Sequence, residues 1–204
     1  MLRKLSQPEV HKETLDFYQS NAAGYFEDTA HGDMSHAYQR FVPLISEGGV
    51  VVDAGCGSGR DSRYFLSKGL IPIPFDASSE MARVVYERTG LEVCVATFED
   101  FVVSHEVDGI WACASLLHVN RVALPGTIQR LGGFLKKGGA FYLSFKSGGG
   151  DRLVNRRYFC DMDEALSHKL VSEIEGFHIL DYWTSVQVSA SLKTNWSNLL
   201  LQKD

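Results

Sequence analysis

Apolar residues along the chain follow two alternating patterns, short runs of strand length and longer segments with helical spacing. The predicted strands cover residues 50–52, 70–75, 91–95, 107–114, 140–145, 178–188 and 195–202. The predicted helices cover residues 9–25, 35–45, 61–68, 124–135 and 163–174, and a further helix begins after Ser78. Strands that alternate with helices are typical of an α/β fold with a largely parallel sheet.

Three stretches modify this alternation. Pro72 argues against full ladder pairing of the second predicted strand, because proline has no N–H to donate. Residues 136–139, Lys-Lys-Gly-Gly, are predicted to end the helix before the fifth strand. Residues 146–150 are glycine-rich and predict a flexible loop, which a basic stretch from Arg152 to Arg157 follows.

The first strand leads into the most informative turn of the chain. Val50–Val52 are three β-branched residues, which indicate a buried parallel strand, and Asp53, Gly55, Gly57 and Gly59 follow. A strand, a glycine-rich turn and a helix open a nucleotide-binding βαβ unit. The glycines adopt backbone angles that a Cβ forbids, and they let a ligand lie against bare main chain at a helix N-terminus.

The spacing of these glycines excludes two common phosphate-binding loops. A P-loop requires Gly-Lys-Ser/Thr after four intervening residues, and this turn has no such lysine. The dinucleotide fingerprint places its third glycine at position 60, where this chain has Arg60. The turn therefore reads Gly-x-Gly-x-Gly, with Asp53 two residues before the first glycine.

Asp76 ends the second predicted strand, 21 residues beyond Gly55. Doubly wound nucleotide folds place a carboxylate there to receive the ribose hydroxyls. Ser78 follows as the predicted cap of the next helix. We interpret Asp76 as a ribose ligand, with a helix-capping carboxylate as the alternative.

The composition restricts the compartment and the partners. The 204 residues fit one domain with a substantial core, and no apolar run approaches the roughly 20 residues of a membrane span. Residues 1–6 lack the apolar region of a secretory signal, and the four widely spaced cysteines indicate reduced, packed thiols and no metal site. The net charge of -5 disfavours nucleic acid as a partner. We therefore predict a cytoplasmic protein without a membrane or metal partner, and leave monomer or homodimer open.

The turn Asp53-x-Gly55-x-Gly57-x-Gly59 resembles the first motif of class I S-adenosylmethionine-dependent methyltransferases. Residues 111–118 and 144–146 resemble a bacterial subgroup of small methyltransferases that is related to tellurite resistance. The resemblance covers about residues 18–203. It implies a Rossmann-like, doubly wound sheet of seven strands, mostly parallel with an antiparallel last strand and with helices on both faces. It also implies one domain over residues 1–204, with a helical lid at 1–46 and the core at 47–204.

The same resemblance implies which residues bind the cofactor, S-adenosylmethionine, and its product, S-adenosylhomocysteine. Asp53 reaches the methionine amino group directly or through water. Arg60 pairs with the methionine carboxylate or only caps the helix surface. Tyr18 and Tyr25 close over the methionine end or are core aromatics of an amphipathic helix. The full predicted set is Asp53, Gly55, Gly57, Gly59, Arg60, Asp76, Ala77, Thr97, Phe98, Glu99, Ala114, Tyr18 and Tyr25.

His118 is the candidate general base, because it follows the fourth strand at the edge of the sheet where ligands lie. The alternative is a histidine that hydrogen-bonds loop main chain. Residues 146–158 are the predicted lid over the acceptor, and Arg152, Arg156 and Arg157 either hold an anionic molecule or form a solvated surface.

The resemblance predicts a methyltransferase acting on a small molecule, namely a thiol, hydroxyl, carboxylate or metalloid oxyanion. The Asn/Asp-Pro-Pro-aromatic sequence of amine- and base-methylating branches is absent, which disfavours amide-like nitrogens as acceptors. The alternatives are an enzyme that modifies RNA or protein, and a non-catalytic regulator that binds the cofactor.

Overall fold

The computed structural model describes residues 7–188 and 193–204; the N-terminal residues 1–6, in which the sequence shows no secretory signal, lie outside the described part. The helices are α1 (Gln7–Thr29), α2 (Ser35–Phe41), η1 (Val42–Leu44), α3 (Arg60–Ser67), α4 (Ser79–Thr89), η2 (Leu116–His118), α5 (Leu124–Gly132) and α6 (Glu164–Ser172). The strands are β1 (Val50–Ala54), β2 (Ile71–Asp76), β3 (Cys94–Val95), β4 (Val107–Ala112), β5 (Leu135–Lys146), β6 (Asp151–Val154), β7 (Arg157–Cys160), β8 (Phe177–Val188) and β9 (Lys193–Lys203).

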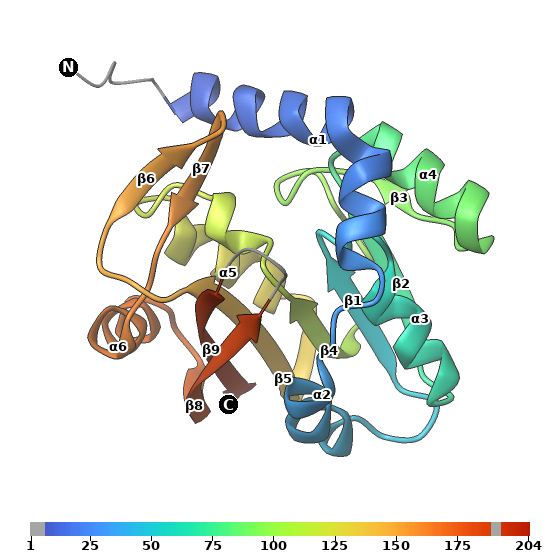
Figure 1. Ribbon diagram of the computed structural model, residues 1–204. Helices are drawn as coiled ribbons and strands as arrows, with labels where there is room; N and C mark the ends of the chain where they lie inside the picture. Colours follow the sequence, from blue (N-terminus) through green and yellow to red (C-terminus); the bar gives the residue numbers. More distant parts are fainter. Residues whose placement is uncertain (1–6, 189–192) are drawn as a thin grey trace.

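Seven strands form one sheet in the order β3-β2-β1-β4-β5-β9-β8 (Figure 1). The strands from β3 to β5 pair in parallel, and β9 runs antiparallel between β5 and β8. The predicted fold class, a mostly parallel seven-stranded sheet with an antiparallel last strand, is confirmed.

Alternation along the strands divides the core between the two faces of the sheet. Val51 and Trp111 face one side, where they pack with the apolar residues of α2 and α3. Val52 and Ile110 face the other side, where they pack with α5 and α6. Both faces of the central strands are therefore buried, as their nearly continuous apolar runs predict.

The predicted helix over residues 124–135 is too long. The helix α5 ends at Gly132, and Leu135 is instead the first residue of β5. Leu135 matches the helical spacing set by Leu131, but the pair Gly132-Gly133 lies between them and weakens the helix. The third strand is also shorter than predicted, with residues 94–95 alone in the ladder.

Pro72 pairs in register with Val51 of β1, and the pairing of β2 with β1 continues through it from Ile71 to Phe75. On the other edge, β3 pairs only with Phe75 and Asp76. Most of β2 is therefore an edge strand, where a missing N–H leaves no ladder partner unpaired.

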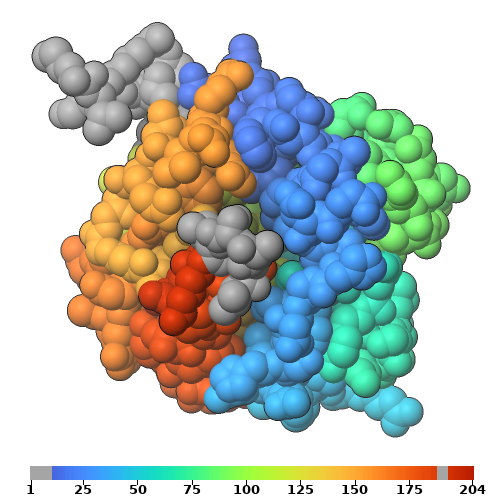
Figure 2. All heavy atoms as spheres, in the orientation of Figure 1, coloured from blue at the N-terminus to red at the C-terminus, as the bar shows by residue number. Residues whose placement is uncertain are grey.

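The basic stretch from Arg152 to Arg157, for which the sequence predicts no strand, lies in the two-stranded hairpin β6–β7. Its turn residues Asn155 and Arg156 have φ of +50° and +66°, the left-handed conformation of a tight hairpin turn. The hairpin is packed beside α1 above the sheet, as the space-filling view shows (Figure 2).

The long helix α1 crosses the carboxyl ends of the parallel strands (Figure 1). It packs on α4 through Ala22 and Phe26, which form a small core with Ala30, Met81 and Val85. No helix in the described ranges is long and apolar enough to cross a membrane.

Candidate active site

The turn after β1 exposes bare main chain at the edge of the sheet. Gly55, Gly57 and Gly59 have φ of +72°, +52° and +66°, so all three use the left-handed conformation that glycine adopts freely. A Cβ at Gly55 would lie 2.6 Å from Cβ of Ser115, and one at Gly57 would lie 3.3 Å from Cε1 of Tyr25. The loop after β4 and the helix α1 therefore approach this turn more closely than a side chain would allow.

The carboxylate of Asp76 is fixed against this turn. Its Oδ2 accepts a hydrogen bond from N of Gly57 at 3.0 Å, and its Oδ1 accepts one from N of Ser78 at 2.9 Å. Burial raises the pKa of Asp76, while these two hydrogen bonds oppose the rise. Each oxygen retains a free lone pair, because a carboxylate has about four acceptor positions. Ser78 itself caps α4 through Met81, as predicted.

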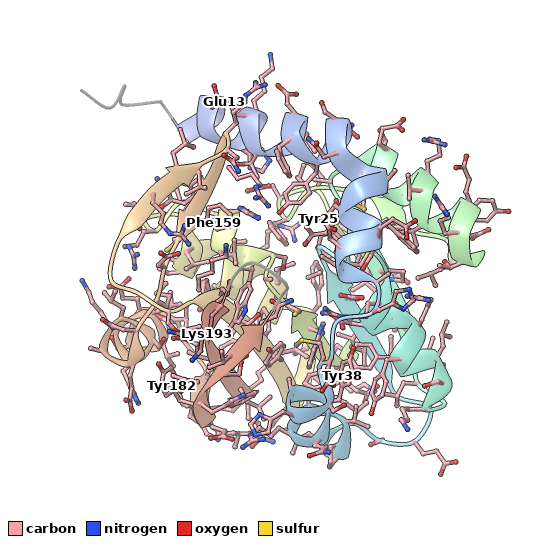
Figure 3. All side chains as sticks on the ribbon, viewed as in Figure 1. Glu13, Tyr25, Tyr38, Phe159, Tyr182 and Lys193 are labelled. Carbon is pink, nitrogen blue, oxygen red and sulfur yellow. The ribbon has the colours of Figure 1, made fainter. Side chains whose placement is uncertain are left out.

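A small cavity of about 90 Å³ lies over Gly55 and Gly57. Eight of the predicted cofactor residues line it, and they are Tyr18, Tyr25, Gly55, Gly57, Asp76, Ala77, Phe98 and Ala114. Tyr25 lies below α1, above the end of β1 (Figure 3). The other two predicted adenine contacts do not line this cavity: the Thr97 hydroxyl donates to Asp100 at 2.8 Å, and Glu99 is exposed.

A larger cavity of about 540 Å³ lies on the other side of the same glycines. The two cavities share Tyr25, Gly55, Gly57 and Ala114. The larger one is lined by polar and aromatic side chains, among them Arg60, Cys113, Ser144, Trp183, Trp196 and Asn198. The sequence prediction includes only Arg60 from this set. Cys113 lies in the loop after β4, and the other four side chains reach the cavity through the pairing of β5, β8 and β9.

Ala114 marks the point where the cavities meet. Its φ of +53° is uncommon for a residue with a Cβ. The conformation is held by its N–H, which donates to Oγ of Ser144 at 2.8 Å. Backbone strain of this kind persists where the surrounding structure fixes it, often at a ligand site.

Arg60 forms a buried ion pair beneath the larger cavity. Its Nε and Nη2 donate to the two carboxylate oxygens of Asp61 at 2.7 and 2.9 Å, and Nη2 also contacts Sγ of Cys113 at 3.4 Å. Asp61 also accepts from Tyr38 and from Nε1 of Trp111. Burial raises the pKa of Asp61, but the charge of Arg60 and these hydrogen bonds outweigh it and lower the pKa. Nη1 of Arg60 has no hydrogen-bond partner in the described ranges.

Asp53 lies below the surface of both cavities. It is buried, it accepts a hydrogen bond from the hydroxyl of Ser62 at 2.6 Å, and it lines neither cavity. Burial, followed by the negative charge of Asp61, raises the pKa of Asp53 to about 8. Burial therefore favours the neutral form of this carboxyl group, which lies under the glycine turn.

His118 lines the small cavity, and both of its ring nitrogens have partners. Nδ1 lies 2.6 Å from the carbonyl oxygen of Tyr158, and Nε2 lies 2.8 Å from the hydroxyl of Tyr18. A carbonyl only accepts, so Nδ1 carries the proton and Nε2 accepts from Tyr18. Burial lowers the pKa of His118 to about 4, which keeps the ring neutral at physiological pH.

Comparison with family models matches residues 51–139 to a methyltransferase domain. Among solved structures, the 1,6-didemethyltoxoflavin-N1-methyltransferase of Burkholderia thailandensis, with bound 1,6-didemethyltoxoflavin and S-adenosylhomocysteine, is similar over 100% of this chain and 92% of its own, with a TM-score of 0.78 and 20% identity. Magnesium protoporphyrin IX methyltransferase (ChlM) of Synechocystis PCC 6803, with bound S-adenosylmethionine, covers 100% of both chains at a TM-score of 0.71 and 16% identity.

A search of curated proteins gives no match. The solved structures share the fold at low identity, and they do not confirm the tellurite-resistance-related subgroup. The matched segment contains the glycine turn, Asp76 and Ala114. Residues 51–139 therefore match a methyltransferase domain, and the chain has the class I fold, which confirms the predicted enzyme class and its S-adenosylmethionine cofactor.

Proposed function

We propose that this methyltransferase acts on a small molecule, which it binds in the larger cavity. The observation that carries the proposal is the junction of two cavities over Gly55 and Gly57. The small cavity offers what a nucleoside requires, namely the Asp76 carboxylate and the apolar side chains of Ala77 and Phe98. The larger cavity, at about 540 Å³, has the size of a small-molecule site. The two similar enzymes described above are named as methyltransferases of 1,6-didemethyltoxoflavin and of magnesium protoporphyrin IX, which supports this class.

The cofactor is assigned to the junction. The free lone pairs of Asp76 receive the ribose hydroxyls, and Ala77 and Phe98 flank the adenine. Nη1 of Arg60, which lines the larger cavity, binds the methionine carboxylate. Asp53 supports the glycine turn from below and does not contact the amino group directly, because it lines neither cavity.

The chemistry requires mainly alignment. The sulfonium of the cofactor supplies an electrophilic methyl group; the acceptor atom forms a bond to that carbon while the carbon–sulfur bond breaks toward sulfur. Positioning of two reactants contributes roughly 7–11 kcal/mol in favourable cases. The residues of this chain bind the two reactants on adjacent surfaces and cover them with α1, which we propose to act as a lid.

His118 is proposed to position Tyr18 and not to act as the general base. Its Nε2 already accepts the hydroxyl proton of Tyr18, and its low pKa makes it a weak base. Acceptors that ionise readily, such as thiols and carboxylic acids, fit a site without a basic group.

The function is tested with the purified full chain. Calorimetry with S-adenosylmethionine, S-adenosylhomocysteine and NAD should show binding of the first two and none of NAD. Transfer of a labelled methyl group should then occur to members of a panel of small thiols, phenols and carboxylic acids. Transfer to RNA or protein but to no small molecule would contradict the proposed substrate class, and binding of the cofactor without any transfer would indicate a regulator.

A further inference from the structure

Three cations surround the ring of Phe159 on β7. Nζ of Lys146 lies 4.4 Å from the ring centroid, and the guanidinium carbons of Arg152 and Arg157 lie at 4.9 and 5.3 Å. An aromatic ring attracts each cation, but the three like charges repel one another. Such a cluster is favourable only if its charge is compensated.

Only one of the three cations is compensated within the described ranges. Arg152 donates through Nε and Nη2 to the two oxygens of Asp161. Lys146 and Arg157 form no ion pair with a described carboxylate, and Nε of Arg157 is buried without a hydrogen-bond partner. A buried donor without an acceptor costs about 1–3 kcal/mol, so this arrangement favours a bound acceptor group.

The repulsion within the cluster affects the pKa of Lys146. Burial lowers the pKa of its ammonium group, and the charges of Arg152 and Arg157 lower it further, against an opposing contribution from Asp161. An anion bound between Lys146 and Arg157 would reduce this repulsion and satisfy the donors.

Lys146 and Arg157 line neither cavity, but each lies near an aromatic ring that does, with Nζ of Lys146 6.0 Å from the ring of Trp196. Lys146 ends β5 two residues after Ser144, so both side chains leave the same face of the sheet, and Lys146 pairs across the strands with Trp196. Ser144 and Trp196 line the larger cavity. The guanidinium of Arg157 lies 5.9 Å from the ring of Tyr18, which lines the smaller one.

The common partner of the cations, Phe159, lies on β7 and below α1 (Figure 3). Its ring is also 5.0 Å from that of His118. The cluster is therefore adjacent to residues that line each cavity, namely Trp196, Tyr18 and His118. It is separate from Asp76 and Arg60, which are assigned to the cofactor.

We propose that Lys146 and Arg157 bind an anionic group of the methyl acceptor, so that the substrate is a small molecule carrying a carboxylate or a phosphate. The inference rests on the proposed function, because it names the substrate class of the same site. An anion held at the end of β5 directs the remainder of the acceptor into the larger cavity, toward Ala114 and the glycine turn. Lys146 and Arg157 then select among acceptors, and the cofactor is bound by other residues.

The test uses calorimetry on the full chain saturated with S-adenosylhomocysteine, with benzoate, phenyl phosphate and benzamide as probes. At least one of the two anions should bind about tenfold or more tightly than benzamide. Each anion can accept charged hydrogen bonds from Lys146 and Arg157, whereas the neutral amide cannot offer a charged acceptor. Lys146→Met should abolish this preference. Lys137→Met, an exposed lysine at the opposite end of the same strand, is the matched control and should retain it.

The outcomes separate the two anions and the two proposals. Preference for benzoate assigns a carboxylate, and preference for phenyl phosphate assigns a phosphate. Equal binding of all three probes, or an undiminished preference in Lys146→Met, would overturn the anion site. If S-adenosylhomocysteine itself fails to bind, the cofactor assignment fails, and the same probes are titrated into the protein alone to decide the anion site.

Discussion

The hydroxyl of Tyr18 donates to Nε2 of His118 across 2.8 Å, and this bond joins α1 to the loop after β4. The two residues are 100 positions apart in the sequence, and both line the small cavity. Tyr18 also packs edge-to-face on Tyr25, which covers the glycine turn. The position of α1 over the site therefore depends on a neutral His118.

Stability should depend on pH through His118. The imidazole has a pKa of about 4 in the folded protein against an ordinary value of 6.5, so the unfolded chain takes up the proton first. The contribution of His118 is complete above about pH 6.5 and decreases as the pH falls from 6.5 to 4. The loss amounts to about 3 kcal/mol. Urea unfolding of the wild type and of His118→Gln from pH 7.5 to 4 measures it, and parallel curves for the two proteins would contradict the assignment.

Replacement of Asp76 by asparagine should weaken cofactor binding. The amide keeps the shape of the side chain but removes the charge and part of the acceptor capacity that the ribose hydroxyls require. We expect S-adenosylhomocysteine affinity to fall about ten- to a hundredfold, measured by calorimetry. Asp108→Asn is the control, because Asp108 also accepts a main-chain N–H, from Val50, but lines neither cavity. An equal loss of S-adenosylhomocysteine affinity in both variants would point to general destabilisation and would contradict the role of Asp76 in ribose binding.

Alanine at Gly57 should affect binding beyond its effect on folding. The φ of +52° makes any side chain strained, and the added methyl group would lie 3.3 Å from Tyr25 on the surface assigned to the cofactor. Gly69→Ala is a matched control, since Gly69 has φ of +74° and open space at its Cβ position. Both variants should lose about 1–2 kcal/mol of stability.

Only Gly57→Ala should also lose affinity for S-adenosylhomocysteine, by about tenfold or more. Normal binding by Gly57→Ala, after correction for its folded fraction, would exclude the turn as the cofactor surface.

Arg60 should recognise the carboxylate of the cofactor. Decarboxylated S-adenosylmethionine should bind the wild type about ten- to a hundredfold more weakly than the intact compound. Arg60→Lys keeps a positive charge beside Asp61 but cannot reach both partners in the same geometry, so the difference between the two compounds should shrink. An unchanged ratio in Arg60→Lys would assign the carboxylate to another group.

The parts of the fold that the sequence predicts are those with local signals. The β-branched run of β1, the glycines after it and Asp76 all lie in one βαβ unit, and each is identified by its own spacing. The end of α3 is likewise signalled by Gly69, whose φ is +74°. These features depend on backbone conformation, which neighbouring residues determine.

The residues that the sequence does not predict reach the site through long-range pairing. Trp196 lines the larger cavity because β9 pairs with β5 around Lys146, 50 positions earlier in the chain. Trp183 joins it from β8 by a second antiparallel pairing. No local pattern distinguishes these tryptophans from ordinary core residues of a strand.

The sequence fails to predict the hairpin β6–β7 because of the residues in its turn. Its turn uses positive φ at both central residues, for which Asn-Gly is the usual sequence signal. Asn155 supplies the first half of that signal, but Arg156 replaces the glycine. The basic residues of this segment therefore suggested a surface loop, although the hairpin brings Arg157 beside Phe159 and Tyr18.

A crystal structure of the protein with S-adenosylhomocysteine tests the central claim most directly. The account predicts the ribose hydroxyls within hydrogen-bond distance of the Asp76 carboxylate, the adenine against Ala77 and Phe98, and the thioether above Gly55 and Gly57. Density for the ligand away from the glycine turn, or a ribose that does not touch Asp76, would contradict it.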